Sequence, residues 1–135
     1  IIAAKMMQAA ALLYQITKTE KTIWKMLKNI AEAVTSTFFT HFTSPNGQTF
    51  QLLKKGNIWF TAVMLKGFIE LYHTDHNKTY LADFKKSLDY AWQYARDKRG
   101  LFQTDWSGTD KNEKKWLLTQ AAFVEMYGRL AGINL

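Results

Sequence analysis

The sequence predicts an all-α chain built from helical hairpins that stack side by side, and three observations support this class. A single proline in 135 residues leaves long helices unbroken. Segments that are apolar almost all round alternate with segments that carry one apolar stripe. The all-round apolar segments also share an apolar-tyrosine dipeptide near their ends, at Leu13-Tyr14, Leu71-Tyr72 and Met126-Tyr127. A repeat of about one helical hairpin is typical of stacked helix pairs.

The first hairpin is predicted to consist of a helix at residues 1–16 and a second helix that begins near Glu20. The first helix is apolar and starts within a periodic run, without a capping residue or the basic region of a secretory signal. We therefore expect the chain to be a piece of a longer polypeptide. The second helix is predicted to be an outer helix, because its apolar residues share one face. These residues are Ile23, Leu27, Ile30 and Val34.

Three more helices are predicted at 58–73, 78–96 and 115–130, which makes about five in all. The 58–73 segment is apolar on nearly every side and is expected to be an inner helix. The 78–96 segment has one apolar stripe and is expected to be an outer helix, whereas 115–130 returns to the inner pattern. An inner helix of this kind needs a neighbour on each side, so we expect further hairpins of the same domain beside these five helices.

Two long polar segments lead into inner helices, at 43–57 and 102–114. The first carries turn-forming residues from Ser44 to Gly47 and is predicted to be a loop throughout. The second contains Asp105-Trp106-Ser107-Gly108. Loops that enter the inner helices are expected to lie at the same end of the array.

Composition excludes several kinds of protein. The absence of cysteine removes disulfides, thiolate nucleophiles and cysteine metal clusters. No stretch reaches the roughly 18 apolar residues of a membrane span, so no membrane partner is expected. The segment His73-Thr74-Asp75-His76 matches no zinc spacing and is predicted to be a solvated turn, so no metal or cofactor is expected. The formal charge of +7 raises the possibility of nucleic-acid binding, but only three of the 18 basic residues are arginines, so no nucleic acid is expected as a partner.

Four segments, taken in order, carry a resemblance to a known family: Asn57 to Tyr72, Gly100-Leu101-Phe102, Asp105 to Gly108, and Leu117 to Met126. Together they resemble the C-terminal part of glycoside hydrolase family 76, which comprises α-1,6-mannanases on an (α/α)6 toroid. The resemblance covers essentially the whole chain. Two positions depart from the family pattern, because Lys66 stands where arginine is common and Thr119 where aspartate is common.

The resemblance implies retaining hydrolysis by two adjacent aspartates, and such a pair lies about 5 Å apart. The 11 acidic residues of this chain include no two neighbours. Residues 1–135 are therefore expected to be the C-terminal part of a single toroid domain, with no catalytic residue of their own. The expected partners are the N-terminal part of that domain, which carries the aspartates, and an α-mannan oligosaccharide or polysaccharide. The family resemblance suggests a secreted, periplasmic or cell-surface location.

Four residues of the loop ends are candidates for sugar binding: Asn57, Trp59, Asp105 and Trp106. An indole presents a flat apolar face and one N–H donor to a sugar, and the two polar side chains can exchange hydrogen bonds with hydroxyls. Each also has a structural interpretation, since Trp59 suits a core position and Asp105 suits a turn. Lys66 is predicted to pair with Glu70, one helical turn away.

Two other functions remain open from the residues. One is a non-catalytic helical-repeat module that binds carbohydrate or protein. The other is a basic helical protein that binds nucleic acid, which rests on net charge alone.

Overall fold

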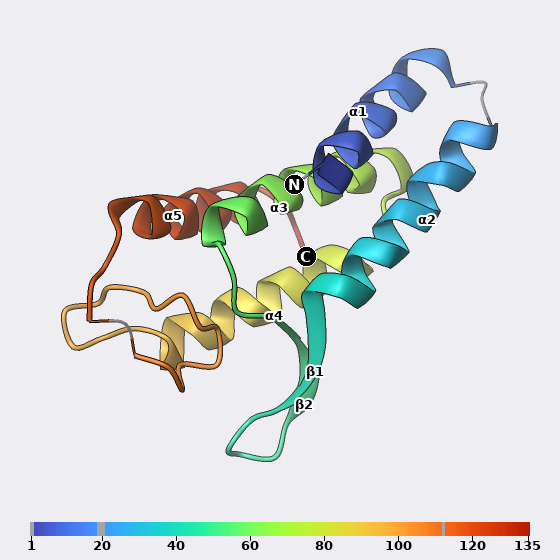
Figure 1. The fold of residues 1–135 in the computed structure, drawn as a ribbon. Coiled ribbons are helices and arrows are strands. Elements are labelled where there is room, and N and C mark those ends of the chain that lie inside the picture. The colour runs from blue at the N-terminus through green and yellow to red at the C-terminus, as the bar shows by residue number, and fades with distance from the viewer. Residues whose placement is uncertain (1, 19–20, 112) are drawn as a thin grey trace.

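The computed structural model describes residues 2–18, 21–111 and 113–135. Within them the chain forms five helices and one β-hairpin (Figure 1). The elements are α1 (Ile2–Thr17), α2 (Lys21–Phe38), β1 (Phe39–Thr43), β2 (Thr49–Leu53), α3 (Ile58–Asp75), α4 (Thr79–Tyr94) and α5 (Leu117–Ala131). The predicted helical architecture is confirmed, with ends that differ from the prediction by up to two residues. The predicted starts at Ile1 and near Glu20 lie outside the described residues.

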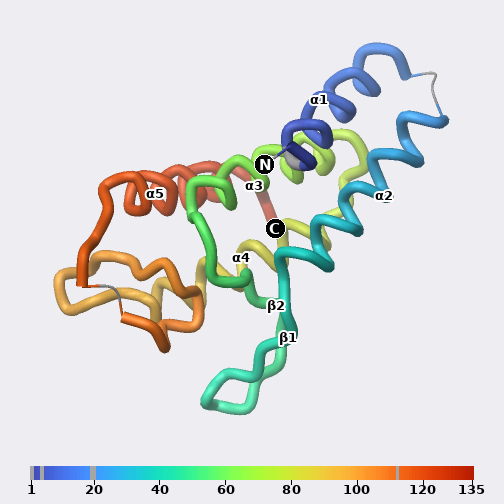
Figure 2. The backbone as a smooth tube through the Cα atoms, viewed as in Figure 1, coloured from blue at the N-terminus to red at the C-terminus, as the bar shows by residue number. Residues whose placement is uncertain are grey.

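The helices form two layers (Figures 1 and 2). Helices α1, α3 and α5 make one row in which α3 lies in the middle and contacts both neighbours. Helix α2 packs against α1, and α4 packs against α3 and strand β2. The predicted alternation of inner and outer helices is therefore confirmed, with α1, α3 and α5 as the inner members.

Helix α3 is held by a cap at each end and by its neighbours along its length. The Asn57 carboxamide oxygen accepts a hydrogen bond from the backbone N–H of Trp59 at 3.0 Å, which satisfies one free donor of the first turn. His76 adopts the left-handed conformation at φ 55° and donates its backbone N–H to the carbonyl of Tyr72. Phe68 is buried between Tyr80 and Phe84 of α4. The all-round apolar pattern thus corresponds to burial on several sides.

The prediction that 43–57 is a loop throughout was wrong. Helix α2 ends at Phe38, and residues 39–53 form an antiparallel hairpin in which Phe42 faces Phe50 across the two strands. The turn residues predicted a reversal correctly, since the Ser44 N–H donates to the carbonyl of Gln48 at 2.9 Å. Two short strands of five residues each flank this reversal and were not predicted, although their aromatic and β-branched side chains favour sheet.

The hairpin is anchored to α4 at its base. The backbone N–H of Leu53 donates to the Ser87 hydroxyl, which is fully buried. Phe39 packs edge-on against Phe84. The strands therefore project from the helical layers as a fixed element. In the part of the chain that the structure describes, no helix combines the length and the apolar character that crossing a membrane requires.

Candidate functional site

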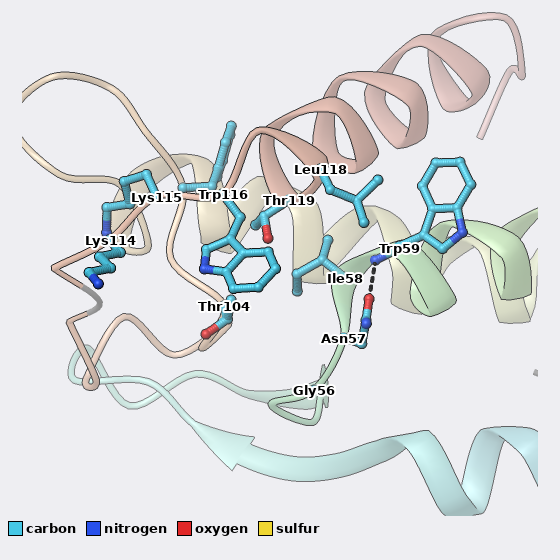
Figure 3. Close-up of a pocket in the computed structure, with 11 residues that line it drawn as sticks. Gly56, Asn57, Ile58, Trp59, Thr104, Lys114, Lys115, Trp116, Leu118 and Thr119 are labelled. Carbon is cyan, nitrogen blue, oxygen red and sulfur yellow. Dashed lines mark hydrogen bonds between the residues drawn. The ribbon is translucent and has the colours of Figure 1, made fainter.

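A cleft of about 270 Å³ lies between the start of α3 and the segment that leads into α5 (Figure 3). One wall comes from the capping turn of α3, and the other comes from residues on either side of the α5 start. The lining residues are Gly56, Asn57, Ile58, Trp59, Phe102, Thr104, Lys114, Lys115, Trp116, Leu118 and Thr119. The cleft therefore joins segments that are separated by more than 40 positions in the sequence.

Asn57 and Trp59, which were both chosen from the sequence, lie on the α3 wall of the cleft. The Asn57 oxygen is used by the helix cap, which fixes the side chain at the mouth of the cleft. Trp59 is half-buried, and the Lys66 ammonium lies 5.9 Å from the centre of its ring. A cation at this distance from an indole is weakly attracted to its face. The α3 wall thus offers an exposed amide and part of an aromatic surface.

Trp116 is the most exposed aromatic side chain of the α5 wall, with 71% of its surface accessible. It occupies the N-cap position of α5 in an extended conformation and makes no capping hydrogen bond with its side chain. Sequence reasoning placed it inside the predicted helix 115–130 and missed it as a site residue. The sequence feature that could have identified Trp116 is its position after Lys114 and Lys115 at a helix start, where polar capping residues are the rule.

The two most specific pieces of the family pattern meet at this wall. The Gln120 side chain accepts from the backbone N–H of Phe102 at 2.8 Å and donates to the Phe102 carbonyl at 3.0 Å. The Phe102 ring stacks on Phe123 with centroids 4.1 Å apart. Gln120 therefore fixes the Gly-Leu-Phe segment against α5, so that Thr104 and Thr119 both reach the cleft.

Asp105 closes the turn that follows. Its carboxylate accepts from the Ser107 hydroxyl at 2.7 Å, from the Ser107 backbone N–H at 3.1 Å and from the Asp110 backbone N–H at 2.9 Å. Partial burial opposes ionisation, but these hydrogen bonds outweigh it and hold the pKa of Asp105 below its usual range. Gly108 is required beside it, because its φ is +72° and a Cβ there would lie 2.1 Å from the carbonyl oxygen of Tyr94. Asp105 does not line the cleft.

Trp106 is fully buried, which corrects the expectation that its indole stacks on a sugar. Its ring packs against Phe123 with centroids 4.9 Å apart. Its indole N–H has no hydrogen-bond partner among the described residues. The reason for the difference is that the loop folds back over α5, so a tryptophan in a polar segment becomes part of the core.

Lys66 pairs with Glu125 on α5, at 2.7 Å, so the predicted pairing with Glu70 was wrong. Arg129 also binds Glu125, at 3.0 Å. The hydrogen bond from Lys66 is the largest influence on this carboxyl and lowers its pKa, burial opposes it, and Arg129 adds to the lowering. This ion pair connects the two inner helices that carry the cleft walls.

An ion pair joins the segment that leads into α3 to the segment that leads into α5, which confirms that the two lie at the same end of the array. The Lys55 ammonium donates to the Asp110 carboxylate at 2.6 Å. Burial lowers the pKa of Lys115, whose ammonium donates to the side-chain oxygen of Gln103. Lys114 and Lys115 are the charged residues of the cleft lining, and no carboxylate lines the cleft as the described residues form it.

The described residues contain no group of three or more side chains that could hold a metal ion. At the far end of α3, the Asp75 carboxylate is only 9% exposed and pairs with Lys28 of α2 at 3.1 Å. The prediction of a solvated turn at His73 to His76 was wrong, because α3 continues to Asp75 and the Asp75 carboxylate connects two helices.

The fold of this chain is similar to parts of two solved structures. The chain is 37% identical in sequence to a family 76 glycoside hydrolase from a bovine Bacteroides thetaiotaomicron strain, which has a crystal structure. The two structures align with a TM-score of 0.90 over 96% of this chain and 28% of that one. It is 34% identical to a family 76 glycoside hydrolase (mannosidase) from Bacteroides thetaiotaomicron VPI-5482, with a TM-score of 0.88 over 96% of this chain and 35% of that one. Neither a family sequence model nor a curated protein matches the chain.

These similarities confirm the predicted fold, in which helical hairpins form part of an (α/α)6 toroid. The chain spans about a third of the length of the two hydrolases.

Proposed function

Since the chain belongs to glycoside hydrolase family 76, we propose that it forms the C-terminal part of a toroid catalytic domain that hydrolyses α-1,6-linked mannan, and that its cleft binds the sugar chain. The observation that carries this proposal is the cleft itself, whose lining includes two tryptophans together with hydroxyl and amide groups at the entrance to the inner helices.

The apolar faces of the two end helices support the proposed place in a larger domain. Helix α5 exposes Leu117 and Val124, and α1 exposes Leu13 and Ile16. These faces continue the row of inner helices on either side, and they suit the packing of further hairpins of the same domain. The N-terminal part of the domain would cover them.

The cleft has the chemistry of a carbohydrate subsite. Trp116 and Trp59 offer ring faces for the apolar C–H surface of a pyranose. Asn57, Thr104 and Thr119 supply amide and hydroxyl groups for its hydroxyls. Retaining hydrolysis needs two carboxyls about 5 Å apart, and none lies in the cleft lining, so the rest of the domain would supply both.

The proposal is tested by electrophoresis of the native chain through gels that contain linear α-1,6-mannan. The formal charge of +7 carries the chain toward the cathode, and mannan binding slows it. Trp116→Ala removes an exposed ring and is expected to weaken the binding by about five- to tenfold. Phe38→Ala is the matched control, because Phe38 is also an exposed aromatic but does not line the cleft.

Retardation by mannan that Trp116→Ala weakens and Phe38→Ala preserves supports the proposal. Equal mobility in gels with and without mannan overturns it. A longer polypeptide that includes this chain is expected to cleave linear α-1,6-mannan with retention of configuration, which is read from the anomer of the first product by NMR.

A further inference from the structure

A second groove of about 510 Å³ lies between the β-hairpin and the C-terminal half of α4. Its lining residues are Ser44, Asn46, Gln48, Thr49, Phe50, Lys86, Asp89, Tyr90, Gln93 and Tyr94. None of them lines the first cleft. The groove is therefore a separate surface, built by an element that sequence reasoning did not predict.

An aromatic platform forms the floor of this groove. Tyr94 is 49% exposed, although the centre of its ring lies only 4.5 Å from that of buried Tyr90. Tyr90 in turn packs against Phe42 and Phe50 of the hairpin, with centroids 5.2 and 5.5 Å apart. Tyr94 is thus held by a cluster of tilted and edge-on rings and still leaves about half of its own surface open to a ligand.

The rim of the groove is polar and has no net charge. The side-chain amides of Gln48 and Gln93 are exposed and make no hydrogen bond among the described residues. Within the lining, Lys86 and Asp89 carry opposite charges, and Lys85, which pairs with Asp89 at 2.7 Å from outside the lining, adds a single positive charge nearby. A polyanion or a polycation gains little from such a rim. An uncharged ligand rich in hydroxyls matches both the amides and the aromatic floor.

The surface continues around α4 beyond the groove. Trp92 is 51% exposed, and the Arg96 guanidinium lies 3.8 Å from the centre of its ring. Trp92 and Tyr127 line a neighbouring hollow of about 520 Å³ that shares Asp89 and Gln93 with the groove. Two exposed aromatics on one half of an outer helix, with connected hollows, suit an elongated ligand.

We propose that the hairpin and α4 form a second saccharide-binding site, which holds a neutral polysaccharide chain by stacking on Tyr94 and by hydrogen bonds to Gln48 and Gln93. The choice of mannan as the saccharide rests on the proposed function. This site has no catalytic role and raises the affinity of the domain for a polymer by engaging it at a second point.

The test uses the same gels with linear α-1,6-mannan, with amylose as a second neutral polymer. Tyr94→Ala removes the exposed ring and is expected to weaken binding by about five- to tenfold. Tyr94→Phe keeps the ring contact with Tyr90 and is expected to bind as the unaltered chain does. Gln93→Ala leaves the platform intact and is expected to weaken binding by about twofold to fivefold. Phe38→Ala is again the control.

Each outcome decides the inference. Weakened binding in Tyr94→Ala and Gln93→Ala, with a further loss when Trp116→Ala is added, supports it for whichever polymer is retained. Unchanged binding in Tyr94→Ala and Gln93→Ala, together with a loss in Trp116→Ala, overturns the second site and leaves the proposed function standing. Retardation by neither polymer overturns the second site. Circular dichroism of each variant shows that its helices are formed.

Discussion

Helices α3 and α5 have similar apolar sequences but very different surroundings. In α3, Leu65, Phe68 and Leu71 are all buried. In α5, Phe123 and Met126 are buried, whereas Leu117 and Val124 are 84% and 70% exposed. The difference follows from position, because α3 has an inner helix on each side and α5 is at the end of the row.

The comparison shows that apolar periodicity reports what a helix can bury, and that its neighbours decide what it does bury. Exposed leucine and valine on α5 cost little in this chain, since they are accessible in the unfolded state as well. We propose that they become core positions when further hairpins of the domain pack against them. The predictions below compare the buried residues of α3 with the exposed face of α5 that carries Leu117 and Val124.

The largest effect is expected from Phe68→Ala in α3. Phe68 is 1% exposed and packs against two aromatic rings of α4, so its truncation leaves a cavity. The free energy of unfolding should fall by about 3–5 kcal/mol. Val124→Ala in α5 is the matched change on an exposed position and should alter it by less than about 0.5 kcal/mol.

Urea unfolding followed by circular dichroism measures both variants. A loss of unfolding free energy for Val124→Ala as large as that for Phe68→Ala would contradict the conclusion that α5 has an uncovered face, because it would require Val124 to be buried.

A smaller effect is expected where the two helices are joined by charge. Glu125→Gln removes the carboxylate that binds Lys66 and Arg129 and should lower the free energy of unfolding at pH 7 by about 1 kcal/mol. The folded-state pKa of Glu125 lies below its ordinary value, mainly because of the hydrogen bond from Lys66. Its contribution is therefore complete above the unfolded pKa of about 4.3 and is lost as the pH falls through the folded pKa.

The stability difference between the unaltered chain and Glu125→Gln should thus be seen at pH 7 and disappear in acid. Urea titrations at several pH values test this. A difference that persists unchanged well below pH 4 would show that the carboxylate charge is not its source.

The smallest effect on stability is expected from polar substitutions on the outer face of α5. Leu117→Gln together with Val124→Gln should change the free energy of unfolding by less than about 0.5 kcal/mol, since both side chains are exposed. Through this apolar face the unaltered chain is expected to self-associate and to bind a hydrophobic dye, and the same pair should reduce both the association in sedimentation and the dye fluorescence. Unchanged association and dye binding would mean that this face is not the exposed apolar surface that we describe.

Local sequence patterns predicted most of the helical framework. The all-round apolar residues of α3 indicated an inner helix, and the single stripe of α4 indicated an outer one. The hairpin was missed because Ser44 to Gly47 dominate the pattern and the flanking strands are short. The partner of Lys66 was missed because Glu125 lies on another helix, and a spacing rule considers only residues within one helix.

Residues that line the cleft could be predicted only where their position depends on residues nearby in the sequence. Asn57 and Trp59 were chosen at the start of an inner helix, and both line the cleft. Asp105 and Trp106 were chosen from a loop whose path depends on contacts with α5, and the structure uses them in a turn and in the core. Sugar binding by Asn57 and Trp59 stays a prediction.

The central claim is that the cleft between the starts of α3 and α5 binds α-1,6-linked mannose residues. NMR titration of the isotope-labelled chain with α-1,6-linked mannotetraose tests it most directly. We expect shifts of the Trp116 indole N–H and of the backbone amides of Asn57, Trp59 and Thr119. Resonances of these four residues that do not move at saturating mannotetraose would contradict the claim.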